Sequence, residues 1–382
     1  MDCQKLFSVI DTLSEEYFAI LEDVCNLESP TADKAGVDKV GAYFVEMARK
    51  RGWKVESLPL ETAGDPICIT LNPEANARPV TFSGHIDTVH PVGLFGYPPA
   101  RREGDKLYGP GALDCKGGVV ASFLAMDALE RCGFTARPVQ LIIQTDEETG
   151  SKTSGKKTVD YMCSMAKDAV AFLNTEGSDG NKITVARKGI LRYQFHIRGK
   201  ATHSSRCEKG INAIVEAAHK ILKLEELKDP EGLTCNCGVI RGGTVANTVA
   251  EECSFLADIR FANQEQCEQA QALVQELAEH SYLPGCTCRL EKVSDRPAMP
   301  LEDRNLALLE TINGIYAQVG LDALIGKKER GGSDTAYTTR AGIPCLDGFG
   351  VDGDGIHSVR EYALLSSLVT SAKRQAAVAW GI

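Results

Sequence analysis

The stretch "LIIQTDEETG", residues 141–150, joins an apolar segment to three consecutive carboxylates. Its first three residues are typical of a buried strand, and the chain then passes into Asp146, Glu147 and Glu148. Adjacent carboxylates repel one another, and burial raises their pKa values unless positive charge lies nearby. The stretch therefore predicts a buried strand whose end needs a cationic partner.

Outward from this strand, strand-like and helix-like segments alternate. Helices are expected at about 6–25, after "SPTADKAG" (29–36) and at 117–133. The other strands are expected at 67–71, 80–84 and 169–174. Ser29 or Thr31 is expected to cap the second helix. This alternation predicts an α/β fold with a mostly parallel sheet flanked by helices.

The pattern changes at Arg187, where "ILRYQFHIRGKA" alternates apolar and polar residues like a half-buried antiparallel strand. The segments that follow read helix, strand, strand, helix, strand, which completes a ferredoxin-like βαββαβ unit. We therefore expect residues 187–295 to be a domain inserted into a catalytic domain made of residues 1–186 and 296–382.

The composition limits the class of protein. The chain has 382 residues, of which 43% are hydrophobic and 25% charged, and this suits a globular protein of about two domains. A net charge of -10 argues against nucleic acid or an anionic membrane as a partner. We find no signal peptide and no apolar run long enough to span a bilayer. The 14 cysteines contain no CxxC pair, so we expect free thiols in a reducing cytoplasm.

Polar residues follow several of the expected strands where those strands end. In an open α/β sheet, ligands bind outside the carboxyl ends of the strands, so these residues are expected to converge. Asp114 joins them from a loop before a glycine-started helix. The candidates are His85, Asp87, Asp114, Glu147, Glu148, Glu176 and His357.

Two imidazoles with several carboxylates form a ligand set that suits zinc, cobalt or manganese. Charge arithmetic favours two ions. Two divalent cations bring about +4, and Asp114, Glu148, Glu176 and one hydroxide return about -4. The cationic partner of the strand end at residue 144 is therefore predicted to be a metal pair.

Each residue alone has an alternative interpretation. His85 and Asp87 could bond only to each other, Glu176 could face solvent, and His357 could be an ordinary loop histidine. Asp146 is assigned no chemistry beyond a turn. It is the joint placement at strand ends that favours the metal interpretation.

Six motifs in order give the chain a family resemblance. They are "SGHIDTV", "YGPGALDCKGG", "TDEETGS", "NTEGS", "RGKATHSS" and "GIHS". The chain resembles the co-catalytic zinc amidohydrolases, which include succinyl-diaminopimelate desuccinylase, acetylornithine deacetylase, aminoacylase and the bacterial glutamate carboxypeptidases. It looks most similar to the carboxypeptidase branch, because "GGTVANTVAEECSFLADIRF" and "GGSDTAYTTRAGIP" also match. The resemblance implies a zinc-exopeptidase-like fold whose inserted domain is a dimerisation or lid domain.

The resemblance also implies roles for the metal ligands. His85 and Glu176 would hold one zinc, Glu148 and His357 would hold the other, and Asp114 would bridge them. The peptide bond after Asp114 is expected to be cis. Cys115 departs from the Asp or Met often found at its position, and it puts an oxidisable thiol near the metals.

Further roles follow from the same resemblance. Glu147 would be the general base and Asp87 the residue that orients His85. His203 and Asn247 would stabilise the oxyanion, with His203 acting across a homodimer joined through the inserted domains. Arg296 and Arg260 would bind a substrate carboxylate. For Arg260, the alternative is a salt bridge with Asp258 or a nearby acid. The remaining histidines, His90, His196, His219 and His280, are expected to be structural or solvated, without converging partners.

The favoured function is a dinuclear zinc hydrolase of small peptides or N-acyl amino acids that carry a free α-carboxylate. A tripeptide-type aminopeptidase is the alternative within enzymes, and it would need an acidic group for the substrate's ammonium. A non-catalytic, metal-stabilised binding protein is the rival outside enzymes. Glu147 argues against that rival, because a binding protein needs no base. Neither the preferred side chain or acyl group nor the native metal follows from the sequence.

Overall fold

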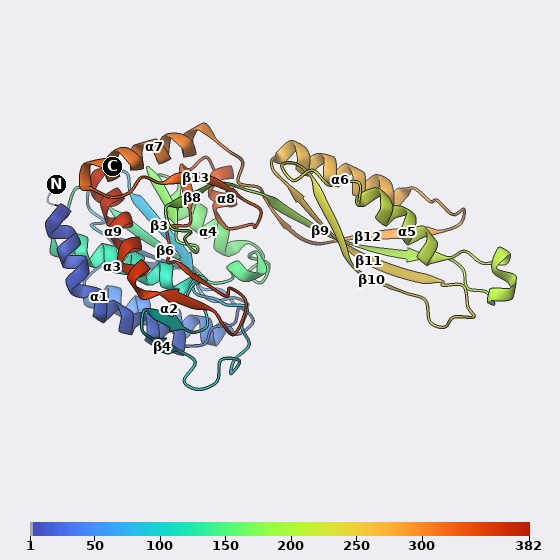
Figure 1. Ribbon diagram of the computed structural model, residues 1–382, viewed down its shortest axis with the longest axis horizontal. Helices are drawn as coiled ribbons and strands as arrows, with labels where there is room; N and C mark the ends of the chain where they lie inside the picture. The colour runs from blue at the N-terminus through green and yellow to red at the C-terminus, as the bar shows by residue number, and fades with distance from the viewer. Residues whose placement is uncertain (1–2) are drawn as a thin grey trace. The chain divides into compact units, whose positions relative to one another are not determined.

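The computed structural model describes residues 3–382, which form two compact units (Figure 1). The first unit comprises the chain up to Val185 with Leu301–Lys328 and Ser333–Ile382. The second comprises Ala186–Pro300 and Glu329–Gly332. The chain thus leaves the first unit twice, first for Ala186–Pro300 and then for the short segment Glu329–Gly332.

The first unit is built on an eight-stranded sheet in the order β1-β2-β6-β3-β7-β14-β8-β13. Its central strands β6, β3, β7 and β14 run parallel, while β1, β2 and β8 pair antiparallel with their neighbours. The bounds are β1 (Lys54–Ser57), β2 (Ile67–Leu71), β3 (Val80–His85), β6 (Val139–Gln144), β7 (Ala171–Asn174), β8 (Lys182–Arg187), β13 (Ile325–Glu329) and β14 (Cys345–Asp347). Every residue of β2, β3 and β7 is buried, as expected for strands covered on both faces.

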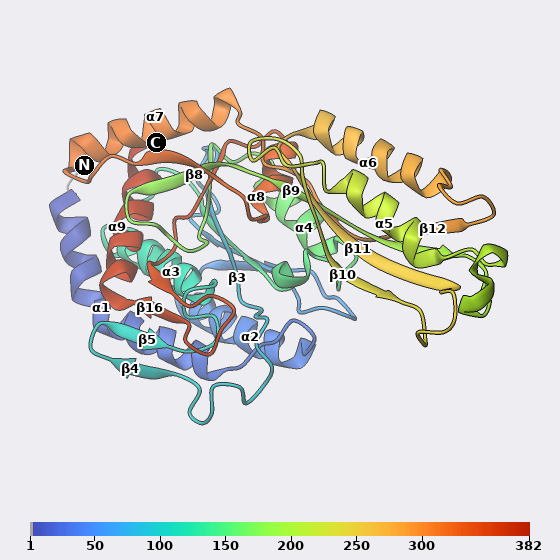
Figure 2. The ribbon, with the colours of Figure 1, turned by 45° about the vertical axis from the view of Figure 1, so that its right-hand side comes forward.

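Helices flank this sheet. They are α1 (Cys3–Asn26), α2 (Lys34–Lys50), α3 (Lys116–Arg131), α4 (Lys157–Ala166), α7 (Asp303–Val319), α8 (Thr335–Arg340) and α9 (Leu365–Gly381). α3 is buried along almost its whole length and packs against α1, α9 and the strands β3 and β6 (Figure 2). The close approach of α3 to the sheet requires glycine at position 118, where a Cβ atom would lie 2.0 Å from the carbonyl oxygen of Thr175. The start of α3 is thereby held next to the end of β7.

A small second sheet in the first unit has the order β15-β16-β5-β4. Its strands are β4 (Arg101–Glu103), β5 (Lys106–Tyr108), β15 (Gly353–Asp354) and β16 (Tyr362–Leu364). Tyr108 of β5 is paired with Tyr362 of β16. This sheet therefore brings the segment before residue 114 beside the segment that carries residue 357.

The second unit has the order β9, α5, β10, β11, α6, β12, which is the βαββαβ order expected from the sequence. The bounds are β9 (Gly189–Arg198), α5 (Ala213–Leu224), β10 (Thr234–Gly242), β11 (Glu252–Phe261), α6 (Gln264–Glu279) and β12 (Thr287–Arg296). The sheet is antiparallel in the order β10-β11-β9-β12. Alternate residues of β9 and β11 are buried, and Phe195 and Phe255 stack with ring centroids 4.5 Å apart. The fold is therefore the mixed α/β class predicted from the pattern.

The prediction that Ser29 or Thr31 caps the second helix is wrong. Residue 33 occupies the N-cap position of α2, and its side chain makes no capping hydrogen bond. Ser29 instead donates to the carbonyl oxygen of Ile86, at 2.6 Å, and Thr31 donates to the carboxylate of Asp87, at 2.7 Å. Both hydroxyls are buried against the end of β3, so distant partners replace the local one.

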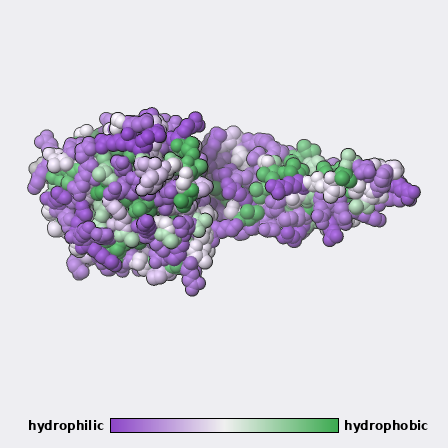
Figure 3. Space-filling model, turned by 90° about the horizontal axis from the view of Figure 1, so that it is seen from below, coloured by the Kyte–Doolittle hydropathy of each residue, from purple (hydrophilic) through white to green (hydrophobic). Residues whose placement is uncertain are grey.

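The surface in Figure 3 is mostly hydrophilic, with apolar residues scattered over both units. Among residues 3–382, no helix combines the length and the apolar composition that a bilayer crossing demands. All 14 cysteines lie within the described range, and eight of them are buried.

Candidate metal centre

Three neighbouring strands of the first unit end at the same edge of the sheet. β3 ends at His85, which lies opposite Gln144, the last residue of β6. On the other side of β3, Ser83 lies opposite Asn174 at the end of β7. A single turn of 3-10 helix (Glu147–Thr149) follows β6, so this register carries the predicted acidic residues to the same edge.

Asp114 lies between two histidines. Its Oδ1 lies 3.0 Å from Nε2 of His85, and its Oδ2 lies 3.3 Å from Nε2 of His357. The same His357 nitrogen is 3.3 Å from Oε2 of Glu148, and the His85 nitrogen is 3.8 Å from Oε1 of Glu176. One carboxylate therefore faces two imidazoles, each of which has a second carboxylate beside it.

These distances suit metal ligation. Donor atoms of His85, Asp114 and Glu148 all lie within 4.8 Å of one another, and a second such group contains His85, Cys115 and Glu176. Two donors on a tetrahedral ion with bonds of about 2.0 Å are about 3.3 Å apart. Both groups contain His85 and neither contains His357, so the donor atoms suit a divalent cation beside His85.

Two acidic members of the cluster, Glu148 and Glu176, have raised pKa values. Burial raises the pKa of Glu148 to about 7; the hydrogen bond from His357 opposes that shift and the charge of Asp114 adds to it. Burial also raises the pKa of Glu176 well above 4.5, and the charge of Asp114 acts in the same direction. These two carboxylates therefore lack enough positive charge within the chain.

The histidines and Asp114 shift in the complementary direction. Hydrogen bonds to Asp114 and Glu148 raise the pKa of His357 to about 10. Burial alone would lower the pKa of His85, but the acidic groups around it, led by Cys115 and Asp114, raise it well above 6.5. Burial opposes ionisation of Asp114 too, yet hydrogen bonds from the two histidines hold its pKa well below 3.8. Without a metal, protons on the imidazoles of His85 and His357 supply the positive charge that metal cations would supply beside the acids.

Asp87 fixes both the imidazole and the acidic turn. Nδ1 of His85 lies 3.0 Å from the backbone oxygen of Asp87 and 3.4 Å from its Oδ1. The carboxylate of Asp87 also accepts the backbone N–H groups of Glu147 and Glu148, both at 3.2 Å. Nε2 of His85 consequently points toward the cluster. In metal-bound histidines, a carboxylate or carbonyl on the other ring nitrogen usually orients the ring in this way. The contacts to the turn are a feature that the sequence interpretation missed.

The peptide bond between Asp114 and Cys115 is cis, as predicted from the resemblance. The thiol of Cys115 donates to the carbonyl oxygen of Thr175 at 3.1 Å.

Asp146 accepts hydrogen bonds from the backbone N–H of Ser154 and the hydroxyl of Thr158, so its buried carboxylate stabilises the turn after β6.

Sequence reasoning missed Glu361. Its buried carboxylate accepts the N–H groups of Leu113 and Asp114, at 2.9 and 3.0 Å. His90, which was expected to lack a converging partner, lies 2.7 Å from the same carboxylate. That expectation was wrong because the partner lies 271 positions away in the chain. The signal that remained in the sequence was an acidic residue at the start of the strand-like "YALL".

In the second unit, the structure brings His203 and Asn247 onto adjacent segments. His203 is the exposed N-cap of a short 3-10 helix, with its Nδ1 accepting the N–H of Ser205 at 3.2 Å. The backbone oxygen of Asn247 accepts the N–H of Ser204 at 2.9 Å, and His203 pairs with Thr248 in a β-bridge. The two residues predicted to stabilise an oxyanion are therefore neighbours.

The two candidate arginines differ. Arg260 is paired with Asp258 at 2.6 Å, which is the alternative stated from the sequence, and Arg192 shares that carboxylate at 2.7 Å. Arg296 is the last residue of β12 and is buried. Its side chain packs so closely on Gly332 that a Cβ atom there would lie 2.8 Å from its Cδ.

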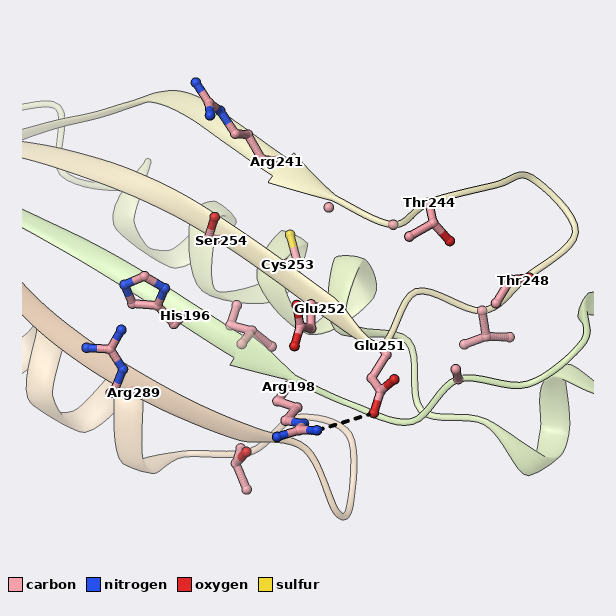
Figure 4. A pocket seen from close by; sticks show the side chains of 16 residues that line it. His196, Arg198, Arg241, Thr244, Thr248, Glu251, Glu252, Cys253, Ser254 and Arg289 are labelled. Carbon is pink, nitrogen blue, oxygen red and sulfur yellow. Dashed lines mark ion pairs between the residues drawn. The ribbon is translucent and has the colours of Figure 1, made fainter.

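A hollow of about 740 Å³ lies on the sheet of the second unit (Figure 4). Arg241, Ser254, His196 and Arg289 form one row across its four strands, each directly opposite the next. Charges of both signs line it, and Figure 4 marks the ion pair between Arg198 and Glu251. None of its lining residues belongs to the predicted catalytic set, so we assign it no role in catalysis.

Comparison with known families identifies the class of protein. The model of peptidase family M20/M25/M40 matches residues 81–380. The chain belongs to this peptidase family. This membership makes it a hydrolase, and it confirms the resemblance stated from the six motifs.

Individual M20 relatives cover nearly the whole chain. Carboxypeptidase G2 from Pseudomonas sp. is 29% identical over 355 residues, which are 91% of this chain and 85% of that protein. Among solved structures, the aminopeptidase PepT from Bacillus cereus has a TM-score of 0.78 at 21% identity, covering 96% of this chain and 98% of its own. A dinuclear metal-binding M20 peptidase from Bacillus subtilis has a TM-score of 0.70 at 14% identity, covering 97% and 98%. At these identities the two structures establish the fold alone.

Proposed function

We propose that this M20 protein is a dinuclear zinc-dependent amide hydrolase. It acts as a carboxypeptidase or N-acyl amino acid deacylase on substrates with a free α-carboxylate. The observation that carries the proposal is Asp114, whose two oxygens face two different histidines at 3.0 and 3.3 Å. The similarity to carboxypeptidase G2 over 91% of the chain supports the substrate class.

His85 and Glu176 would hold one cation, His357 and Glu148 the other, and Asp114 both. Zinc fits this mixture of imidazole and carboxylate, with cobalt or manganese as substitutes. When bound, the two cations supply Lewis acidity that acidifies water and polarises an amide carbonyl.

The residues of the chain carry the proton. Glu147 accepts a proton from the attacking water and delivers it to the leaving nitrogen, which turns that nitrogen into a stable amine. Asp87 keeps the backbone of Glu147 in place through the 3.2 Å hydrogen bond to its N–H. Glu147 and Glu148 are neighbours with separate tasks, because one must bind metal and the other must stay free to exchange protons.

Arg296 is proposed to bind the substrate carboxylate, since a guanidinium meets a carboxylate with two parallel hydrogen bonds. Arg260 is the second candidate, and its guanidinium is paired with Asp258 at 2.6 Å. His203 and Asn247 are proposed to stabilise the oxyanion.

We further propose a homodimer joined through the second units. Large apolar side chains are exposed on α5, on the edge strand β10 and on the loop after it. They are Ile214, Val215, Leu222, Val239, Ile240 and Val245. An edge strand with exposed apolar residues is a template for pairing with another copy. Mixing inactive Glu147→Gln and His203→Ala chains should restore partial activity if His203 acts on the partner's site; no recovery after proven subunit exchange contradicts it.

One panel of substrates tests the function. The full-length, zinc-loaded protein is incubated with N-acyl amino acids, dipeptides and the same compounds with amidated C-termini, and products are identified by mass spectrometry. We expect hydrolysis of the free acids and loss of most turnover with the amides. Equal cleavage of both would overturn the carboxylate requirement and favour the tripeptide-type aminopeptidase, whose fold this chain shares. No hydrolysis of any compound by a metal-loaded chain would favour a binding protein.

A further inference from the structure

Glu361 is a buried carboxylate enclosed by hydrogen-bond donors. Only 1% of its side chain is exposed. Oε1 accepts the N–H groups of Leu113 and Asp114, at 2.9 and 3.0 Å, and Oε2 accepts the more distant N–H of Gly111, at 3.4 Å. Nε2 of His90 lies 2.7 Å from Oε2. Consecutive backbone N–H groups that converge in this way form a cradle for an anion, and Glu361 fills it.

The cradle lies in the loop that ends at Asp114. Because the amides of Leu113 and Asp114 both point at one oxygen of Glu361, the backbone from which the Asp114 side chain departs has one orientation. That orientation sends Oδ1 toward His85 and Oδ2 toward His357. A rotation of this backbone would change the distances from the two oxygens to the two histidines.

Glu361 also joins this loop to the loop of His357. It follows His357 by four residues, and its backbone N–H donates to the oxygen of Ser358 at 3.0 Å. Its backbone oxygen accepts the N–H of Gly109 at 3.3 Å, next to the pairing of β5 with β16. One residue therefore touches the loops that carry two of the proposed ligands.

We infer that Glu361, held by His90, is a positioning residue that sets the bridging geometry of Asp114 and couples the two metal positions. This inference rests on the proposed dinuclear site. Groups that orient a metal ligand from behind typically contribute about 10- to 100-fold in metal affinity. Glu361 itself binds neither metal nor substrate in this account.

The test is metal binding by the full-length Glu361→Gln variant. The amide keeps the shape of the side chain but directs an NH2 group at N–H donors, whichever way it is turned. We expect the apparent zinc affinity, measured by competition with a chromophoric chelator, to fall about 10- to 100-fold. We also expect the visible spectrum of the cobalt-loaded protein to change, because the geometry of the bridging carboxylate changes.

Asp127→Asn is the matched control. Asp127 is a buried carboxylate of the same unit, and it accepts hydrogen bonds from Tyr17, Arg51 and Arg131. It touches none of the proposed ligands in the described hydrogen bonds, so this variant should lose thermal stability while keeping the wild-type zinc affinity and cobalt spectrum.

The outcomes separate the inference from the proposed function. If Glu361→Gln binds zinc with wild-type affinity and gives the wild-type cobalt spectrum, Glu361 is merely structural and the inference fails. If the wild-type protein itself binds fewer than two metal ions, the proposed dinuclear site fails instead. Should Glu361→Gln not fold, His90→Gln carries the test: a lowered zinc affinity with a changed cobalt spectrum supports the inference, and wild-type values overturn it.

Discussion

Two clusters of buried charge, one in each unit, behave in opposite ways. In the second unit, Lys220 lies 2.8 Å from Glu216, and their side chains are 0% and 1% exposed. Glu216 also accepts two backbone N–H groups, and Lys220 donates to two backbone carbonyls. These partners are Tyr282 and Leu283 for Glu216 and Leu277 and His280 for Lys220.

The two clusters differ in the pKa values of their buried glutamates. Burial opposes ionisation of Glu216, but hydrogen bonds from Lys220 and Leu283 hold its pKa below 4.5. In the first unit, burial raises the pKa of Glu148 to about 7 and that of Glu176 well above 4.5. Glu216 has a buried lysine as its partner, whereas Glu148 and Glu176 have only the histidines beside them and keep raised pKa values. A buried acid with its own lysine indicates a structural role, whereas buried acids with raised pKa values beside histidines favour a site for cations from outside the chain.

The largest expected effect concerns the base. Glu147→Gln should keep the metals and lower kcat by about 100- to 10,000-fold, because the amide cannot accept a proton. The neighbouring Glu148→Gln is the matched variant, and it should lose metal as well as activity. Metal content and kcat are measured on both proteins. Loss of metal from Glu147→Gln with retention in Glu148→Gln would mean that the two roles are exchanged.

Substitutions in the cluster of Lys220 and Glu216, here called the closed cluster, should change stability and leave metal binding unchanged. Lys220→Met leaves Glu216 buried without its cation, which should lower the free energy of unfolding by about 3–5 kcal/mol. The more exposed pair of Lys34 and Asp65, 2.7 Å apart, gives the control. Lys34→Met should cost at most about 1 kcal/mol. Urea unfolding and zinc affinity are compared, and a loss of zinc affinity in folded Lys220→Met would break the distinction between the clusters.

A smaller effect is expected at the proposed substrate arginine. Arg296→Lys keeps the charge but loses the planar fork, so KM for a free-acid substrate should rise about tenfold with little change in stability. Arg260→Lys is the control, because its partner is Asp258, and its KM should change less than about threefold. Steady-state kinetics on both variants decide the matter. Equal changes in KM for the two variants would mean that Arg260 also binds the substrate.

The smallest effect is a pH dependence confined to the closed cluster. Because the folded pKa of Glu216 lies below 4.5, its stabilising effect is complete above that pH and is lost as the pH falls through the folded pKa. The difference in unfolding free energy between metal-free wild type and Glu216→Gln should therefore be constant from pH 7 to about 5 and then shrink. Unfolding curves across this range test it, and a difference that grows on acidification would contradict the ion pair.

The comparison also explains what the sequence could predict. The strand ends at His85, Glu148 and Glu176 were predictable, because parallel strands bring their carboxyl ends to one edge whatever the loops do. The βαββαβ order was predictable for a similar reason, since the hydrophobic period changes visibly from 3.6 to 2 residues.

Contacts between distant segments were not predictable. Glu361 meets the amide of Asp114 across 247 positions, and a backbone amide leaves no trace in the residue type. Ser29 and Thr31 had a local helix end as a plausible partner, yet their hydroxyls bond to the end of β3. Local sequence pattern predicts the proposed ligands, and the residues that orient them are found only in the tertiary structure.

The central claim is that the uncompensated acids of the first unit are balanced by two divalent cations. The most direct measurement is elemental analysis of the full-length protein after saturation with zinc and removal of loosely bound ions, with amidase activity followed in parallel. The account predicts about two equivalents of zinc per chain, with full activity only when both are bound. One equivalent at saturation with full activity would contradict it.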